Sequence, residues 1–233
     1  MKLASRLFTL VAAAALSGSA LAGCDNSESS SGGGGTGGST STTSGSTTPS
    51  DSTTSSGPVA LTPQDLVGEW AGACETYPDG KGGENHLTRD FTLTDKTWDL
   101  TFTVYADGAC TTGLFTAKIH GPYTLGGLSA KVDGATEGQF GFETNAWTAH
   151  IQQMADTFTS AGCGADPWQV EVAQDVGATG CIGVAHKIAD CPEEYDLVGI
   201  QDDGKLYFGE RITDMCSEAG RPAALGPFGL TKK

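Results

Sequence analysis

The sequence predicts an all-β fold with one or two short helices. Apolar and polar residues alternate from Trp98 to Tyr105, which is the pattern of a strand with one buried face. Similar segments follow at regular spacing and are joined by Gly-rich turns, an arrangement typical of a β-sandwich or barrel. Six cysteines lie in the same part of the chain, and this even number predicts three disulfides in an exported protein.

The start of the chain predicts export and lipid attachment. Lys2 and Arg6 precede an apolar stretch from Leu7 to Leu16, so residues 1–23 are expected to be a bacterial signal peptide. The sequence Leu-Ala-Gly-Cys at 21–24 resembles the lipobox, where lipoprotein signal peptidase cuts before a cysteine that carries diacylglyceryl and palmitate chains. Cys24 is therefore the predicted lipid-attachment residue. The alternative is an ordinary cleaved signal with an unmodified thiol, while a transmembrane helix would need about 20 apolar residues.

Residues 24–57 are expected to be a flexible tether, and residues 58–233 a single folded domain. From 25 to 57, 28 of 33 residues are Ser, Thr or Gly, so nothing there can be buried, and the expected span is about 30 Å. The domain holds 25 of the 28 acidic residues and 11 of the 13 Lys and Arg, a net charge of −14. This charge argues against nucleic acid as a partner and against membrane contact beyond the anchor. The predicted location is the bacterial cell envelope, with the domain in the periplasm or at the cell surface.

The elements of the domain are expected in the following order. Thr62, Pro63 and Asp65 have the spacing of a capped helix start. A hairpin follows, with a turn at Asp95-Lys96 that places Phe91 opposite Leu100 and Leu93 opposite Trp98. Ile151, Met154 and Phe158 share one face of a helix that Gly162 ends. Further strands are predicted at residues 115–120, 128–132, 139–144, 146–150, 168–173, 182–187, 195–200 and 206–211.

The last hairpin predicts one disulfide. Asp203-Gly204 is a favoured two-residue turn, which would pair Asp202 with Lys205 and place Cys191 directly opposite Cys216. A disulfide between these two cysteines is therefore expected. The other four cysteines allow three connectivities, and nearness favours Cys74 with Cys110 and Cys163 with Cys181.

An ordered series of motifs resembles one known family. Gly68-Glu69-Trp70, Cys74-Glu75, Leu87-Thr88-Arg89-x-Phe91, Trp98, Tyr105-x-Asp107-x-x-Cys110, Gly121-x-Tyr123 and Gly134-Ala135-Thr136-Glu137 occur in the order of the adenomatosis polyposis coli down-regulated (APCDD) domain. The segments Cys163 to Val170, Gln174-Asp175-Val176 and Gly180-Cys181 are similar to its later half, so the resemblance runs from about Leu66 to the C-terminus.

The resemblance implies a single antiparallel β-barrel or half-barrel, lipocalin-like in plan, with a hydrophobic pocket. Animal members are membrane-anchored inhibitors of Wnt signalling thought to engage the lipid on that ligand. This chain has one copy of the domain and a predicted bacterial lipid anchor, so only the fold and a capacity for apolar ligands carry over. Large apolar residues on the predicted elements are the expected ligand-binding residues: Trp98, Phe102, Phe115, Phe140, Phe142, Trp147, Met154 and Phe158.

The sequence contains no pattern for catalysis, a cofactor or a metal. The four histidines lie at least thirty residues apart, and no CxxC, HExxH, GxSxG or phosphate-binding loop occurs. Cys181 and His186 would lie on opposite faces of a strand, so a Cys-His dyad is not expected. Arg89 and Glu137 are expected to form an internal ion pair.

Two functions from different classes remain. The first is a lipoprotein, not an enzyme, whose barrel binds a hydrophobic small molecule or acyl chain. The alternative is a protein-interaction module with a solid barrel core, whose loops at 77–85 and 214–227 contact a protein of the envelope.

Overall fold

The structure is a computed structural model that describes residues 57–78, 83–165, 167–181 and 184–233. The predicted signal peptide, Cys24 and most of the predicted tether lie outside the described residues. Within the described part of the chain, no helix has the length and apolar character needed to cross a membrane.

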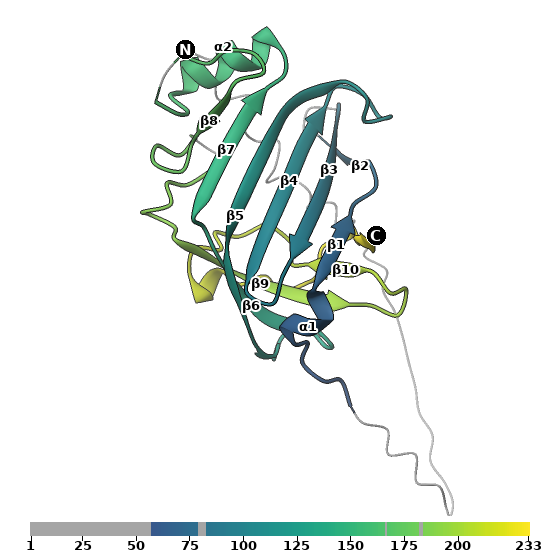
Figure 1. Cartoon of the computed structure of the whole chain (residues 1–233). Helices are drawn as coiled ribbons and strands as arrows, with labels where there is room; N and C mark the ends of the chain where they lie inside the picture. The colour runs from purple at the N-terminus through teal and green to yellow at the C-terminus, as the bar shows by residue number, and fades with distance from the viewer. Residues whose placement is uncertain (1–56, 79–82, 166, 182–183) are drawn as a thin grey trace, which may run out of the picture. The chain divides into compact units, whose positions relative to one another are not determined.

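The described residues form one antiparallel sheet of 11 strands with short helices (Figure 1). The helices are α1 (Pro63–Leu66), α2 (Gln152–Ala161) and the 3-10 turn η3 (Glu218–Gly220). The strands are β1 (Gly68–Ala71), β2 (Glu75–Pro78), β3 (Glu84–Leu93), β4 (Thr97–Tyr105), β5 (Gly113–Leu128), β6 (Thr136–Gly141), β7 (Thr144–Ala149), β8 (Ala173–Asp175), β9 (Glu193–Ile200), β10 (Leu206–Phe208) and β11 (Thr231–Lys232).

The sheet is nearly closed into a barrel, which confirms the all-β prediction. Its main order is β10-β9-β6-β5-β4-β3-β1-β11. The two ends of this path meet at Leu206 and Leu230, whose backbones exchange hydrogen bonds of 3.0 and 2.8 Å. Where the path closes, it leaves no unpaired strand edge, and such edges would otherwise be sites of aggregation.

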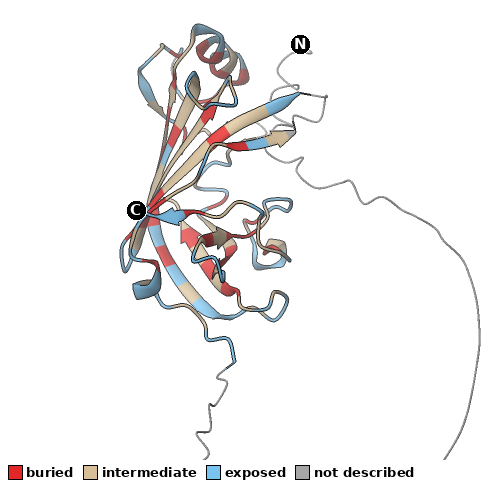
Figure 2. Ribbon diagram, turned by 90° about the vertical axis from the view of Figure 1, so that its right-hand side faces the viewer, coloured by how far each residue is buried: buried red, intermediate tan, exposed pale blue. Residues whose placement is uncertain are grey.

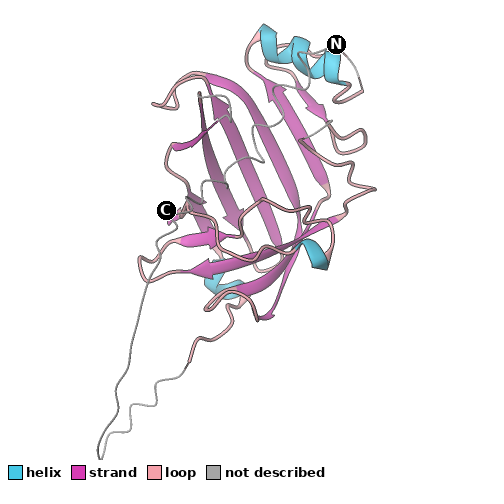
Figure 3. Ribbon diagram, turned by 180° about the vertical axis from the view of Figure 1, so that it is seen from behind, coloured by secondary structure: helices cyan, strands magenta, loops and turns pink. Residues whose placement is uncertain are grey.

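The barrel is closed at one end only, because the long strand β5 changes partner along its length. Residues 115–120 of β5 pair with β7, whereas residues 123–128 pair with β6. Between these halves lies Gly121, where a Cβ atom would stand 2.0 Å from the carbonyl oxygen of Gly141. Only glycine allows this approach. Beyond this point β3, β4, β5 and β7 continue as an open curved sheet (Figures 1 and 3).

Two hydrophobic cores occupy the two regions, and Figure 2 shows buried residues in both. The core of the closed end is built around Trp70, Phe91, Trp98 and Phe140. The indole nitrogen of Trp70 donates to the carbonyl of Leu66 at 2.8 Å, which ties α1 to this core. The second core packs α2 against β7.

The local predictions for the first hairpin and the helices are confirmed. Phe91 lies opposite Leu100 and Leu93 opposite Trp98, with residues 95–96 in the turn. The Asp65 carboxylate accepts from the backbone nitrogen of Thr62 at 2.7 Å, as expected for the capped start of α1.

Helix α2 is followed by Gly162 in the left-handed conformation with φ of 69°. This is the expected helix end.

Several predicted strand boundaries are wrong. β5 ends at Leu128, because the Ser129 hydroxyl accepts the backbone nitrogens of the next turn. Residues 168–172 form no strand, because Glu171 takes a positive φ of 62°. In the predicted strand 182–187, residues 182–183 lie outside the described residues, and Ala185 forms only an isolated bridge with Cys181. β10 stops at Phe208, because the chain then pairs with residues 224–225.

The last hairpin is paired one residue away from the predicted register. Gln201 pairs with Lys205 through its backbone nitrogen at 3.1 Å, and Leu206 lies opposite Ile200. The turn has three residues instead of two, with Gly204 at φ of 73°. This is a turn followed by a left-handed glycine, a common alternative for an Asp-Gly hairpin.

The three disulfides join the cysteines that the sequence pairs: Cys74 with Cys110, Cys163 with Cys181, and Cys191 with Cys216. The last pair forms although the hairpin register differs by one residue. The chain leaves the β9–β10 ladder after Phe208 and returns to β9 near Cys216, where the backbone nitrogen of Tyr195 donates to the carbonyl of Met215 at 2.8 Å.

Candidate functional site

An apolar cavity of about 190 Å³ borders the inner face of the sheet. Its first wall consists of alternate residues of β3, β4, β5 and β7, because successive side chains of a strand point to opposite faces. Most of the outward-facing residues between them, such as Thr101 and Lys118, are polar. The described residues of this wall and of the closed end that line the cavity are Arg89, Phe91, Trp98, Leu100, Phe102, Phe115, Ala117, Ile119, Phe140, Phe142, Asn145, Trp147 and Phe208.

The strand register places the wall residues in rows across the sheet. One row contains Phe91, Leu100, Ile119 and Asn145. The next row towards the open end contains Arg89, Phe102, Ala117 and Trp147. With strands about 4.8 Å apart, Arg89 and Trp147 are separated by roughly 14 Å across the wall. The apolar surface between them is therefore long enough to contact an extended chain.

The second wall comes from the segment before β9. Val184, Ala185, His186 and Ile188 line the cavity from this side, followed by Cys191. Figure 3 shows loop segments passing over this side of the sheet. The Cys163–Cys181 and Cys191–Cys216 disulfides hold the chain on either side of this wall.

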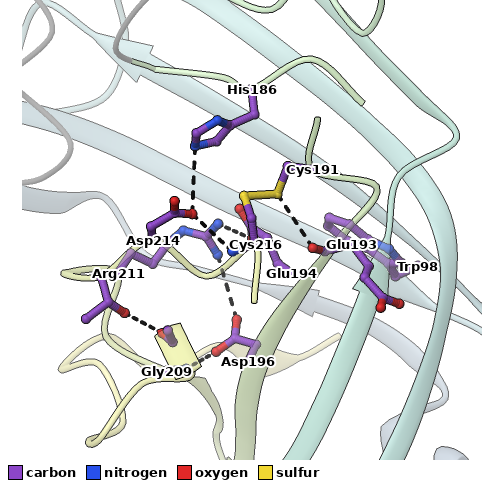
Figure 4. Close-up of polar contacts among 12 residues, drawn as sticks. Trp98, His186, Cys191, Glu193, Glu194, Asp196, Gly209, Arg211, Asp214 and Cys216 are labelled. Carbon is purple, nitrogen blue, oxygen red and sulfur yellow. Dashed lines mark hydrogen bonds and ion pairs between the residues drawn. A yellow bond between two sulfur atoms is a disulfide. The ribbon is translucent and has the colours of Figure 1, made fainter. Parts of the chain in front are cut away.

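Charged side chains also line the cavity next to this second wall (Figure 4). Arg211 forms an ion pair with Glu194 and approaches the Asp196 carboxylate at 3.7 Å. Asp196 is 2% exposed, and its Oδ1 accepts the backbone nitrogens of Leu197 at 2.7 Å and Gly209 at 2.9 Å. Burial raises the pKa of Asp196 to about 6, although Arg211 and the two backbone donors act in the opposite direction.

The second charged group on the wall is Arg89. It forms an ion pair with Glu75 at 3.0 Å and also donates to the carbonyl of Phe228 at 3.2 Å. Tyr77 donates to the same Glu75 carboxylate at 2.8 Å, and burial raises the pKa of this tyrosine. The expected pair of Arg89 with Glu137 is therefore wrong.

The partner of Glu137 is Arg221, at 3.6 Å. Arg221 is buried and donates to the carbonyls of Gly138 at 2.9 Å and Asp196 at 2.6 Å. Arg89 therefore meets an acid on the neighbouring strand β2, 14 residues before it, whereas Arg221 meets an acid 84 residues before it in the sequence.

The structure brings together six of the eight residues predicted to bind a ligand. Trp98, Phe102, Phe115, Phe140, Phe142 and Trp147 border the cavity. Met154 and Phe158 do not: they pack in the core beneath α2, where Phe158 is 1% exposed and contacts Trp168. Their helical spacing indicates that this face of α2 is buried, but the spacing does not distinguish burial in a core from contact with a pocket.

Sequence reasoning missed the polar residues of the site. Asn145, Arg211, Glu194 and Asp196 line the cavity, yet none stands in a recognisable motif. The one available signal was the period of two in β7, which places Asn145 on the same face as Trp147.

Within the described residues, one grouping of His, Cys and acidic side chains comes close enough for a shared ion: His186, Asp214 and Cys216. The sulfur of Cys216 is bound to Cys191, and His186 and Asp214 are mostly exposed. This grouping does not make a metal site.

A nearly closed β-barrel with an apolar cavity is compatible with a binding module. The family model described as adenomatosis polyposis coli down-regulated 1 matches residues 51–176 of this chain. The protein therefore belongs to the APCDD family. The match covers the first wall of the cavity, while β9, β10 and the second wall lie beyond it.

Proposed function

We propose that this protein is a lipid-anchored module of the bacterial envelope that binds an apolar, lipid-like ligand in its cavity without catalysis. The observation that carries the proposal is the cavity wall, where aromatic and aliphatic side chains face open space in a folded protein. Ligand sites are typically concave and mostly apolar, with a few polar groups that fix orientation. Phe102, Leu100 and Ile119 are only half-buried, so a ligand would remove apolar surface from water.

The charged groups of the cavity support binding without chemistry. The two arginines on its walls are paired with carboxylates, Arg89 with Glu75 and Arg211 with Glu194. Asp196, the cavity acid whose pKa is raised by burial, accepts backbone hydrogen bonds that fix its carboxylate in place. Such groups maintain the shape of the site.

The anchor and the ligand site belong together in this proposal. Lipidation of Cys24 would hold the protein at a membrane, and the Ser/Thr/Gly tether would let the domain reach ligands near that surface. Substitution of Cys24 by Ser should release the protein into the soluble fraction of lysed cells. Retention of the Ser variant in the membrane would contradict the anchor.

The four tryptophans provide a direct test of the ligand site. Trp98 and Trp147 line the cavity, whereas Trp70 and Trp168 are buried elsewhere. A brominated fatty acyl methyl ester quenches indoles that it contacts, so it should quench part of the fluorescence of the wild-type protein.

The variants Trp98→Phe and Trp147→Phe should each lose part of the quenchable fluorescence, while Trp70→Phe and Trp168→Phe should keep all of it. Absence of quenching at saturating ester, or equal quenching in all four variants, would contradict the proposed site.

A further inference from the structure

A buried side-chain amide borders the cavity. Asn145 lies on β7, is 7% exposed, and faces the same side of the sheet as Trp147 and Ala149. It also lines the cavity, at the end of the row that contains Ile119 and Leu100. An asparagine in this apolar wall requires hydrogen-bond partners.

The orientation of the amide follows from its neighbour. The indole nitrogen of Trp147 lies 2.7 Å from the Asn145 side chain. An indole N–H can only donate, so the Asn145 atom that accepts is Oδ1. The Nδ2 group, with its two donors, must therefore point away from the indole.

The Nδ2 group has no acceptor among the described residues, where the one hydrogen bond of the Asn145 side chain is the bond from Trp147. Nor is this nitrogen sealed inside the protein. Within the described part of the chain, the only buried side-chain nitrogen or oxygen closed off without a partner is Nδ2 of Asn85. The Asn145 Nδ2 group thus reaches open space, and the open space beside this buried residue is the cavity.

We propose that Asn145 Nδ2 is a specificity determinant that donates a hydrogen bond to a neutral carbonyl oxygen of the ligand. This inference rests on the proposed function and names the ligand class: an apolar chain carrying an ester, amide or ketone carbonyl. A ligand without an acceptor would leave the amide desolvated and unpaired, which costs affinity.

The charges of the site favour a neutral carbonyl over a carboxylate. The guanidinium groups of Arg89 and Arg211 are already paired with acids. A ligand carboxylate would therefore meet no unpaired guanidinium among the described cavity residues, and Glu194 would repel it.

The test compares two ligands that differ at one position. 2-Decanone has a carbonyl oxygen where 2-methyl-1-decene has a CH₂ group. Affinities are measured for the purified protein by competition with the neutral dye Nile red. The readout is the ratio of the alkene Kd to the ketone Kd, which a general loss of stability or packing does not change.

The variants isolate the amide donor. Trp147→Phe removes the indole donor, so Asn145 can then be replaced by Leu without leaving an unpaired indole. The Kd ratio should fall about 5- to 10-fold from Trp147→Phe to the double variant Trp147→Phe/Asn145→Leu, the range expected for one neutral hydrogen bond. Decanoate should compete less well than the ketone in the wild-type protein.

A second readout uses the unmodified protein. The side-chain ¹⁵NH₂ resonances of Asn145 should shift when the ketone is added and stay in place with the alkene. An unchanged Kd ratio, or equal shifts with both ligands, would overturn the role of Asn145 while leaving the apolar site intact. If neither ligand displaces the dye, the proposed function fails and the inference fails with it.

Discussion

Two phenylalanines that share one sequence-based prediction should respond in opposite ways to substitution. Phe158 is 1% exposed and lies close to the rings of Phe115, Trp147 and Trp168, at centroid distances of 5.3, 5.4 and 4.8 Å. Phe102 is half-buried, its ring centroid lies 6.2 Å from that of Phe115, and its side chain lines the cavity. Truncation of Phe158 therefore removes core packing, whereas truncation of Phe102 removes ligand contact.

The expected magnitudes follow from burial. Phe158→Ala leaves a void in a close-packed core and should lower the free energy of unfolding by about 3–5 kcal/mol. Phe102→Ala loses only part of a buried side chain and should cost about 1 kcal/mol. If a ligand covers about 50 Å² of the Phe102 ring, its loss weakens binding by about 1.3 kcal/mol, or roughly tenfold in Kd.

Stability is measured by guanidinium unfolding with the disulfides intact, and affinity by Nile red displacement with 2-decanone. Phe158→Leu is the matched variant if Phe158→Ala does not fold. We expect Phe102→Ala to change Kd more than stability, and the Phe158 variants to change stability more than Kd. Equal effects of the two substitutions on both quantities would refute the separation of core from cavity wall.

Three further predictions concern the scaffold. Burial raises the pKa of Asp196 to about 6, so the folded protein binds a proton that the unfolded chain has released, and stability should fall as pH rises from about 4 to 6. Asp196→Asn should remove this slope, worth up to about 3 kcal/mol in total and about 2 kcal/mol between pH 4.5 and 7.5, in unfolding titrations at these two pH values; an identical slope in the variant would contradict the assignment. Cys191 and Cys216 are 25 positions apart, so replacing both by Ser should lower the free energy of unfolding by about 3.5 kcal/mol through the loop entropy of the unfolded chain. An unchanged unfolding midpoint would argue against this stabilisation. In Gly121→Ala the new Cβ would stand 2.0 Å from a carbonyl oxygen, so this substitution should lower the free energy of unfolding by about 3 kcal/mol in the same titration. Gly127→Ala places its Cβ with no atom within 4 Å and should leave the free energy of unfolding unchanged. Equal effects of the two substitutions would count against the close approach at Gly121.

The parts of the fold that depend on neighbouring residues could be predicted from the sequence. The β3–β4 register follows from a short turn and a period of two, and α2 follows from its apolar face and terminal glycine. The conformation of the Asp203-Gly204 turn is harder to predict, because this dipeptide suits both a two-residue and a three-residue loop. The choice between these loops shifts the strand register by one residue. The Cys191–Cys216 bond tolerates that shift because the chain is irregular near Cys216.

Only the first wall of the cavity, which the strands form, could be predicted from the sequence. Alternation identifies Trp98 and Phe102 as inward-facing, but the same signal marks a core and a pocket alike. The second wall and the partner of Arg221 depend on how distant segments fold together. Arg221 meets Glu137, which lies 84 residues before it in the sequence.

The most direct test of the central claim is native mass spectrometry of the purified protein, followed by organic extraction of whatever is noncovalently bound. The account predicts a defined extra mass that is released on denaturation and extracts as a neutral compound with an acyl chain and a carbonyl group. A protein that carries no such mass and also fails to take up added fatty acyl esters would contradict the cavity as a ligand site.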